Sequence, residues 1–186
     1  MRAIYDANVL YNASVRDLCL WLAVEGAVEA RWTDKIHQEW TQRLAEHRPD
    51  LGVERIQRLR QTIDTAIPDC LVTGYETAID QLELPDPDDR HVVAAAITCS
   101  ADTIVTFNMN DFPASVLAPY RLEALRPDEF VNRLITLVPQ AVCRAALRHR
   151  ANLRRPAMTV ETYLETLRSR GLPDTANRLP EICSTL

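Results

Sequence analysis

Short apolar runs alternate with longer segments of helical periodicity through the first two thirds of the chain. Runs at residues 3–5, 28–32, 103–107 and 122–125 have the length of buried strands, and a weaker run spans residues 70–73. Between the strands, apolar residues recur every three or four positions, as Ile36, Trp40 and Leu44 do. This alternation predicts an α/β fold with a parallel sheet flanked by helices and right-handed crossovers.

Start and stop signals accompany the helical segments. Ser14 is placed to begin a helix that Gly26 ends, and Thr33 is placed to cap a helix over residues 33–48. Further helices are expected over residues 51–67, from about Asp88 onward, and from Pro127 to about residue 138. Each expected strand, except the one at residues 103–107, is therefore followed by a predicted helix.

From residue 139 onward the pattern is entirely helical. We therefore divide the chain into a first domain of residues 1–138 and a helical C-terminal extension of residues 139–186. The extension is rich in arginine, which predicts a solvated basic face, with RNA contact as the alternative. These arginines are Arg144, Arg148, Arg150, Arg154 and Arg155.

Length and composition are those of a globular protein. With 186 residues, 47% of them apolar and 25% charged, the chain can bury a full core, which excludes a disordered protein. No segment approaches the roughly 20 apolar residues that cross a bilayer, and the N-terminus does not resemble a signal peptide, so we expect a cytoplasmic protein without membrane contact. Five widely spaced cysteines without a CxxC pair predict buried thiols in a reducing compartment. They are Cys19, Cys70, Cys99, Cys143 and Cys183.

Carboxylates follow two of the predicted strands. Asp6 comes directly after the first strand, and Asn108 and Asp111 come after the strand that ends near residue 107. Ligands of open parallel sheets bind at the carboxyl ends of the strands, so these side chains are expected to meet. Together with the hydroxyl of Thr106 they offer the oxygen ligands that Mg²⁺ or Mn²⁺ prefers. The interpretation without function is that Asp6 and Asn108 simply close turns.

Three further acidic residues, Asp88, Asp89 and Glu39, can likewise be interpreted with or without a function. Asp88 and Asp89 stand where a helix begins, and capping alone explains acids there. Asp89, however, shares a helical face with apolar residues and leans toward the packed side. Glu39, within the helix that Thr33 caps, is by itself expected to be an ordinary solvated residue. It is a candidate site residue only if it lies near the other acids.

Several functional classes lack their sequence signals. Only four glycines are present and none forms a phosphate-binding loop, which excludes P-loop and dinucleotide-binding proteins. The four histidines show no HxxxH or HExxH spacing, so zinc has no ligand set. No serine lies in a GxSxG motif, which argues against a serine hydrolase.

Four blocks of the sequence together resemble the PIN domain, and most closely the VapC-type toxin ribonucleases. The resemblance extends over roughly residues 1–135, and the order and spacing of the blocks agree with that family. The blocks are YDANVL at residues 5–10, Glu39, LPDPDDRHVVAAA at residues 84–96 and IVTFNMNDFP at residues 104–113.

The resemblance implies which residues form the active site. The catalytic, metal-binding quartet would be Asp6, Glu39, Asp89 and Asp111, with Asp86 and Asp88 as alternatives to Asp89. Asn8, Asn108 and Thr106 would be flanking polar groups. Some members of the family carry a further aspartate where this chain has Asn108, so one or two metal ions remain alternatives.

The resemblance also implies an activity and its partners. The expected protein is an endoribonuclease that depends on Mg²⁺ or Mn²⁺ and hydrolyses RNA as the toxin of a toxin–antitoxin pair. Its expected partners are the RNA substrate, a VapB-type antitoxin that blocks the acidic groove, and a second copy in a homodimer. The alternative is a PIN-fold binding module that has lost catalysis.

Overall fold

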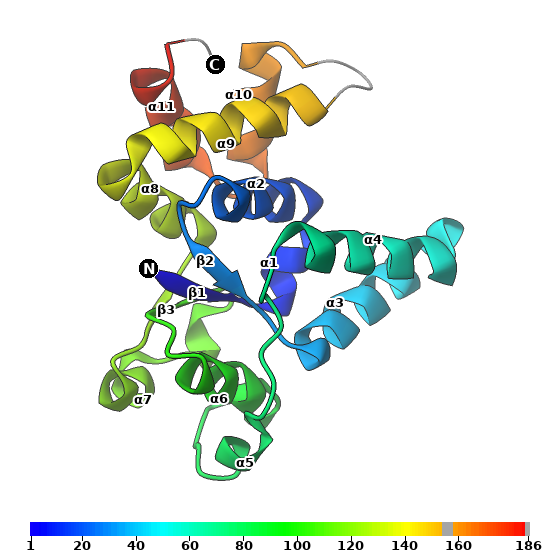
Figure 1. Cartoon of the computed structure of the whole chain (residues 1–186), viewed down its shortest axis with the longest axis vertical. Coiled ribbons are helices and arrows are strands. Elements are labelled where there is room, and N and C mark those ends of the chain that lie inside the picture. The colour runs from blue at the N-terminus through cyan, green and yellow to red at the C-terminus, as the bar shows by residue number, and fades with distance from the viewer. Residues whose placement is uncertain (154–157, 185–186) are drawn as a thin grey trace. The chain divides into compact units, whose positions relative to one another are not determined.

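The protein divides into two compact units in a computed structural model that describes residues 1–153 and 158–184 (Figure 1). The first unit comprises residues 1–11 and 29–126, and the second comprises residues 12–28 with the described residues from 127 onward. The boundary predicted after residue 138 therefore falls inside the second unit. The second unit also contains residues 12–28 from near the N-terminus. A division of the chain at one boundary does not predict this.

A four-stranded parallel sheet forms the centre of the first unit. Its strands are β1 (Arg2–Tyr5), β2 (Glu29–Arg31), β3 (Thr103–Val105) and β4 (Glu123–Leu125), in the order β2-β1-β3-β4. The chain passes from β1 to β2 on one side and later to β3 on the other, so the direction of winding reverses between β1 and β3. Such a reversal opens a crevice at the carboxyl ends of the strands. The predicted α/β fold with a parallel sheet is confirmed.

The apolar runs account for the strands, with one exception. β1 and β3 are almost wholly buried, as strands covered on both faces should be. The run at residues 70–73 contributes only an isolated bridge between Trp32 and Leu71, so the strand predicted there was wrong. Cys70 and Val72 are buried and Leu71 between them is exposed, as in a strand, but the backbone hydrogen bonds of the segment are made to Trp32 alone, so the pairing does not extend.

Helices cover the sheet of the first unit. The helix α6 contacts β1 and β3, while α3 packs against α1 and α4, and α3 and α4 run side by side in Figure 1. The short α1 begins directly after Asp6, where only a turn was predicted. Thr33 caps α3 as predicted, because its hydroxyl accepts the backbone N–H of Ile36 at 3.1 Å. The helices are α1 (Ala7–Tyr11), α3 (Asp34–His47), α4 (Val53–Ala66), α5 (Glu76–Ile79), α6 (Arg90–Thr98) and α7 (Ala114–Leu117), with 3-10 turns η1 (Pro49–Leu51), η2 (Pro87–Asp89), η3 (Met109–Asp111) and η4 (Ala118–Tyr120).

The second unit is a helical bundle. Its main contacts join α2 to α9, α10 to α11, and α8 to α11. The helix predicted from Ser14 starts one residue earlier, with Asn12 in the capping position, and Gly26 follows its end with a φ of 73°. The described helices are α2 (Ala13–Val24), α8 (Pro127–Leu137), α9 (Pro139–Asn152), α10 (Val160–Ser169) and α11 (Pro173–Ile182).

Two arginines of the C-terminal extension are exposed, as predicted, and also form ion pairs within the second unit. The Nε atoms of Arg144 and Arg148 lie 2.7 and 2.8 Å from the two carboxylate oxygens of Glu25, whose side chain is 9% exposed. The guanidinium of Arg148 also lies over the ring of Trp21, at 5.5 Å from its centroid. Arg154 and Arg155 lie outside the described residues.

Two of the five cysteines are not free thiols, which corrects the prediction. Cys143 of α9 and Cys183, which follows α11, form a disulfide with their Cα atoms 5.4 Å apart. The packing of α11 on α9 brings them together although 40 residues separate them, and their spacing carries no signal of it. Cys19, Cys70 and Cys99 are free, and the first two are buried.

Within the described ranges, every helix is too short or too polar to cross a lipid bilayer.

Candidate metal centre

Asp6 stands at the carboxyl end of β1 and is held by several donors. It is 5% exposed, and its Oδ1 accepts the backbone N–H of Ala7 at 2.6 Å. Its own backbone N–H donates to the carbonyl of Val105, the last residue of β3. Because the strands end together, Asp6 lies where the winding of the sheet reverses, as its position in the sequence predicted.

Polar groups that follow β1 and β3 donate hydrogen bonds to the other oxygen of Asp6. The hydroxyl of Thr106 donates to Oδ2 of Asp6 at 2.7 Å, and the amide of Asn8 donates to the same oxygen at 2.6 Å. The carbonyl oxygen of Asn8 in turn accepts the backbone N–H of Phe107 at 3.0 Å. The structure therefore places Asn8 and Thr106 against Asp6, where a supporting role was predicted for both.

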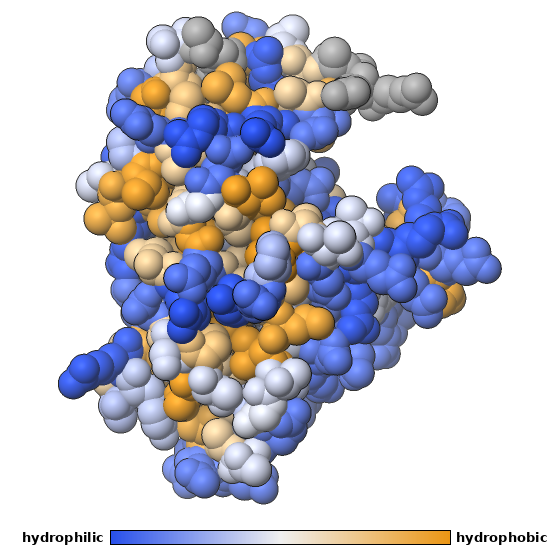
Figure 2. Space-filling view, in the orientation of Figure 1, coloured by the Kyte–Doolittle hydropathy of each residue, from blue (hydrophilic) through white to orange (hydrophobic). Residues whose placement is uncertain are grey.

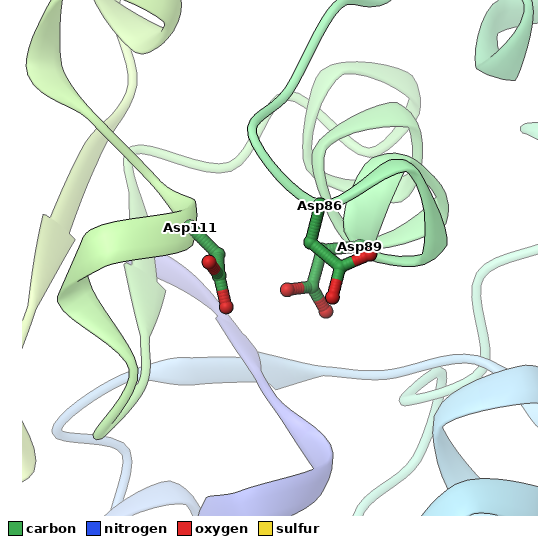
Figure 3. A group of neighbouring side chains, drawn as sticks. All are labelled: Asp86, Asp89 and Asp111. Atoms are coloured by element: carbon green, nitrogen blue, oxygen red, sulfur yellow. The ribbon is translucent and has the colours of Figure 1, made fainter.

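Three other carboxylates converge across the adjoining gap. Each of Asp86, Asp89 and Asp111 offers an oxygen, and these oxygens all lie within 4.8 Å of one another. Figure 3 shows Asp86 and Asp89 at the start of the α6 region facing Asp111, which comes from the other side of the gap. Of the predicted alternatives for the third acid, the structure brings both Asp86 and Asp89 into the group.

Local structure explains how these acids are presented. Asp86 caps the 3-10 turn η2, because its Oδ1 accepts the N–H of Asp88 at 2.9 Å, and this turn directs Asp89 inward. Asp111 closes the turn η3 and accepts a hydrogen bond from the side-chain amide of Asn108. Asn108 therefore orients Asp111 instead of adding a further negative charge. Asp88 is exposed and lies outside the group of three.

Burial, with a smaller contribution from neighbouring charges, raises the pKa values of two of the acids, Asp89 and Asp6. Burial raises the pKa of Asp89 from 3.8 to about 7, with further increases from the charges of Asp6, Asp111 and Asp86. Burial also raises the pKa of Asp6, although the hydrogen bond from Thr106 opposes the shift. A cation bound beside Asp6 and Asp89 would favour their ionised forms and so relieve this electrostatic cost.

Glu39 belongs to the same region but is held differently. Its Oε1 lies 2.9 Å from Nε2 of His91 and 3.6 Å from Nζ of Lys35, and its charge contributes to the raised pKa of Asp6. The separation from His91 is that of an ion pair, without the direction of a linear hydrogen bond. His91 is 5% exposed, and its positive charge would lower the pKa of Asp6 and Asp89.

A cavity of about 280 Å³ connects most of these groups. Its walls include the predicted acids Asp6, Glu39 and Asp89, and they also include residues that the sequence did not single out. The additional predicted residues in the walls are Asn8, Asp86, Asp88 and Asn108, and the unexpected side chains are Tyr11, Trp40 and Arg43.

His91 could have been noticed from the sequence, because it stands two residues after Asp89 in the DDRH segment. Arg43 carries a comparable signal, since it follows Glu39 by four residues and therefore shares its helical face. No such signal marks Tyr11 as a cavity residue, because its orientation depends on how α1 packs on α3.

The donor set suits a hard divalent cation. Carboxylate oxygens are the ligands that Mg²⁺ and Mn²⁺ prefer, and neither histidines nor thiols that would select zinc join the group of three. Asp86, Asp89 and Asp111 can supply direct ligands, while Asp6 contributes charge at the same edge of the sheet.

Comparison with known proteins finds a matching family model for each of two parts of the chain. Residues 2–110 match the sequence model of the PIN domain, and residues 127–181 match that of the VapC50 C-terminal domain. The chain is also 36% identical over 83 residues to a protein of Mycobacterium tuberculosis (strain ATCC 25618 / H37Rv) named "Putative ribonuclease VapC50". That alignment covers 43% of this chain and 49% of the relative, so the similarity spans about half the length of each. No solved structure matches the chain significantly.

Proposed function

This chain belongs to the PIN domain family, and we propose from that membership that it is an endoribonuclease dependent on a divalent metal ion. The observation that carries the proposal is the convergence of Asp86, Asp89 and Asp111 within 4.8 Å, at the sheet edge where Asp6 is fixed. Carboxylates that share so small a volume are stable together only when protons or cations offset their charge. A cavity beside them gives a substrate room to approach.

The residues of the chain have distinct tasks in this proposal. Asp86, Asp89 and Asp111 would hold Mg²⁺ or Mn²⁺, which when bound polarises the scissile phosphate and lowers the pKa of the attacking water. The hydrogen bonds from Thr106 and Asn8 fix the carboxylate of Asp6 in one orientation. Whether one or two ions bind depends on whether Asp6 and Glu39 act as ligands in addition to the group of three.

Glu39 adds a negative charge to the cavity wall, and its neighbours determine its position. His91 and Lys35 both lie near the same carboxylate oxygen, Oε1. A carboxylate oriented by two neighbouring basic groups suits either a metal ligand or an acceptor of a proton from water.

We also propose the biological setting that the comparisons suggest. The matches to VapC50 and to its C-terminal domain support a toxin of a toxin–antitoxin pair, with RNA as substrate and a VapB-type antitoxin as partner. A cytoplasmic location and a homodimer accord with this proposal. The C-terminal helices would then belong to the toxin as a regular second unit.

A second candidate function follows from Asn108. This residue places an amide where a further carboxylate would strengthen metal binding, and its amide donates to Asp111. A PIN-fold module that binds RNA and metal without cleavage would tolerate this arrangement.

Incubation of the purified protein with total RNA distinguishes the two candidates. We expect discrete cleavage with Mg²⁺ or Mn²⁺, none with EDTA, and loss of cleavage in Asp6→Asn and Asp89→Asn variants. Asp80→Asn is the matched control, because Asp80 is an exposed aspartate at the end of α5, away from the cavity. RNA binding without any cleavage, under every metal condition, would favour the inactive module.

A further inference from the structure

One face of α3 carries charged side chains at every fourth position beside the candidate metal centre. Lys35, Glu39, Arg43 and His47 follow one another at intervals of four residues, so they lie along the same side of the helix. Glu39 lies in the wall of the acidic cavity, and so does Arg43. The row therefore places the positive charge of Arg43 in the same cavity wall as the carboxylate of Glu39.

Tyr11 contacts the second half of this row, at Arg43 and His47. Its hydroxyl is 2.9 Å from Nδ1 of His47, and the two rings meet edge to face with their centroids 5.9 Å apart. The guanidinium carbon of Arg43 is 6.0 Å from the centroid of the Tyr11 ring. These contacts hold a partly exposed aromatic ring next to a cation, in the wall of the same cavity.

We infer that Tyr11 and Arg43 form a substrate subsite that binds the nucleotide next to the scissile phosphate of a single-stranded RNA. The inference rests on the proposed nuclease function, since that function places the scissile phosphate at the carboxylates. Tyr11 supplies a flat surface for a base or ribose, and Arg43 supplies the positive charge for the adjoining phosphate.

The charges of the cavity explain why such a subsite is needed. Five of its wall residues are acidic, and they repel the phosphates of any nucleic acid. Within the described part of the chain, Arg43 makes no ion pair with a carboxylate, and it is exposed. Arg43 thus keeps its charge for a ligand, whereas the nearby Lys35 is partly neutralised by Glu39 at 3.6 Å.

The surroundings of the subsite favour an unpaired strand. The region of α3 and α4 is covered mainly by hydrophilic residues on the face drawn in Figure 2. A single tyrosine inside a cavity can reach a base only when that base is unstacked, which a duplex does not allow without distortion. Hydrogen bonding of the Tyr11 hydroxyl to His47 also fixes the ring before the substrate arrives, which lowers the entropic cost of binding.

Binding is measured separately from cleavage to test this subsite. The probe is a fluorescein-labelled single-stranded RNA of about 12 nucleotides, titrated by fluorescence anisotropy with Mg²⁺ in an Asp6→Asn background that impairs cleavage. We expect Tyr11→Leu to raise the Kd about 5- to 50-fold, and Tyr11→Phe to change it less than about 3-fold because the ring remains. A duplex of the same sequence should bind more weakly, and equal affinity would overturn the single-strand assignment.

Arg43 is tested against a matched arginine. We expect Arg43→Gln to raise the Kd about 5- to 10-fold and to reduce the slope of log Kd against log salt by about 0.7, the value for one phosphate contact on a single strand. Arg55→Gln is the control, because Arg55 is an exposed arginine of α4 that, like Arg43, makes no ion pair among the described residues and that does not line the cavity. An equal loss of affinity in both variants would overturn the subsite, since it would reveal general charge attraction.

The outcome for the subsite is separable from the outcome for the nuclease. Cleavage by the wild type with an unchanged KM in the Tyr11→Leu and Arg43→Gln variants would overturn the subsite and leave the nuclease intact. Binding that depends on both residues, without any cleavage by the wild type, would support RNA binding by Tyr11 and Arg43 and overturn both the nuclease and the position of the subsite beside a scissile phosphate. Arg43 is exposed, so its variant decides the question even if Tyr11→Leu does not fold.

Discussion

The hydroxyl of Thr106 donates a hydrogen bond of 2.7 Å to Oδ2 of Asp6, although 100 residues of chain separate the two. The bond is possible because β1 and β3 are neighbours in the sheet with Tyr5 opposite Val105. Each side chain is the first after its strand, so the register of two parallel strands determines the geometry of the candidate site.

Removal of this hydrogen bond should weaken cleavage and shift its pH dependence. Thr106→Val keeps the shape of the side chain but leaves Oδ2 of Asp6 without its hydroxyl donor, so the pKa of Asp6 should rise further. We expect the rate of RNA cleavage to fall about 10-fold or more at neutral pH. The acidic limb of the pH–rate profile should shift to higher pH. Initial rates measured from pH 5 to 9 check this.

Thr106→Ser is the control for that variant, because it retains the hydroxyl. Its pH–rate profile should stay close to that of the wild type. A serine variant as impaired as the valine variant, with both proteins folded, would contradict the role given to the hydroxyl.

Without metal, the protein should become less stable as the pH rises from about 4 to 7. The folded-state pKa of Asp89, about 7, lies above its ordinary value of 3.8, so over this range the folded state holds a proton that the unfolded state has released. Stability is fully present below the unfolded pKa and is lost as the pH passes through the folded one. Because Asp89 is only half-buried, solvent screening limits the loss to about 1–2 kcal/mol.

Urea denaturation of EDTA-treated protein at pH 5 and pH 8 measures this loss. In Asp89→Asn the loss between the two pH values should shrink by the contribution of this carboxyl group, and the variant should be the more stable protein at pH 8. An unchanged difference between the two pH values in the variant would show that Asp89 is not responsible.

Addition of Mg²⁺ or Mn²⁺ should raise the melting temperature of the wild type. A cation that binds only the folded state stabilises it in proportion to the logarithm of its concentration over the Kd, about 2.7 kcal/mol at one hundred times the Kd. Asp111→Asn should reduce the increase, because it removes one of three convergent carboxylates. Differential scanning calorimetry with and without the metal checks both proteins.

Asp80→Asn serves as the control here as well, since it removes an equal charge from an exposed position. Its melting temperature should respond to metal as that of the wild type does. Absence of any metal response in the wild type would count against the proposed centre.

In the second unit, Asp128 should stabilise the packing of α8 and α11. Its two carboxylate oxygens accept the backbone N–H groups of Asp174 and Thr175, at 2.9 and 2.8 Å, and so cap the first turn of α11. Asp128→Ala should lower the free energy of unfolding by about 1–2 kcal/mol, because those N–H groups lose their acceptors.

Asp128→Asn should have a smaller effect, since an amide oxygen still caps a helix. Chemical denaturation followed by circular dichroism compares the two variants. Equal stability of the alanine variant and the wild type would show that water replaces the cap without cost.

Much of the fold followed from local patterns. The four strands and the helices over residues 33–48 and 51–67 follow hydrophobic periodicity and capping residues, which act over a few neighbouring positions. The order of the acids after strands placed Asp6 and Asp111 at one edge because parallel strands all end on the same side. The strand expected at residues 70–73 is reduced to one bridge with Trp32, because a short apolar run does not by itself determine how far two segments pair.

The sequence by itself determined the chemistry of the candidate centre, namely its carboxylates, their supporting polar groups and their attachment to the ends of strands. Only the tertiary structure decided which groups share one volume: that Asp86 joins Asp89 and Asp111, that His91 meets Glu39, and that Tyr11 and Arg43 enter the same cavity. It also decided that Cys143 pairs with Cys183, and that the second unit takes α2 from near the N-terminus. The physical reason is that local patterns reflect the environment of each residue along its own helix or strand, whereas contacts between distant segments depend on how those elements pack against each other.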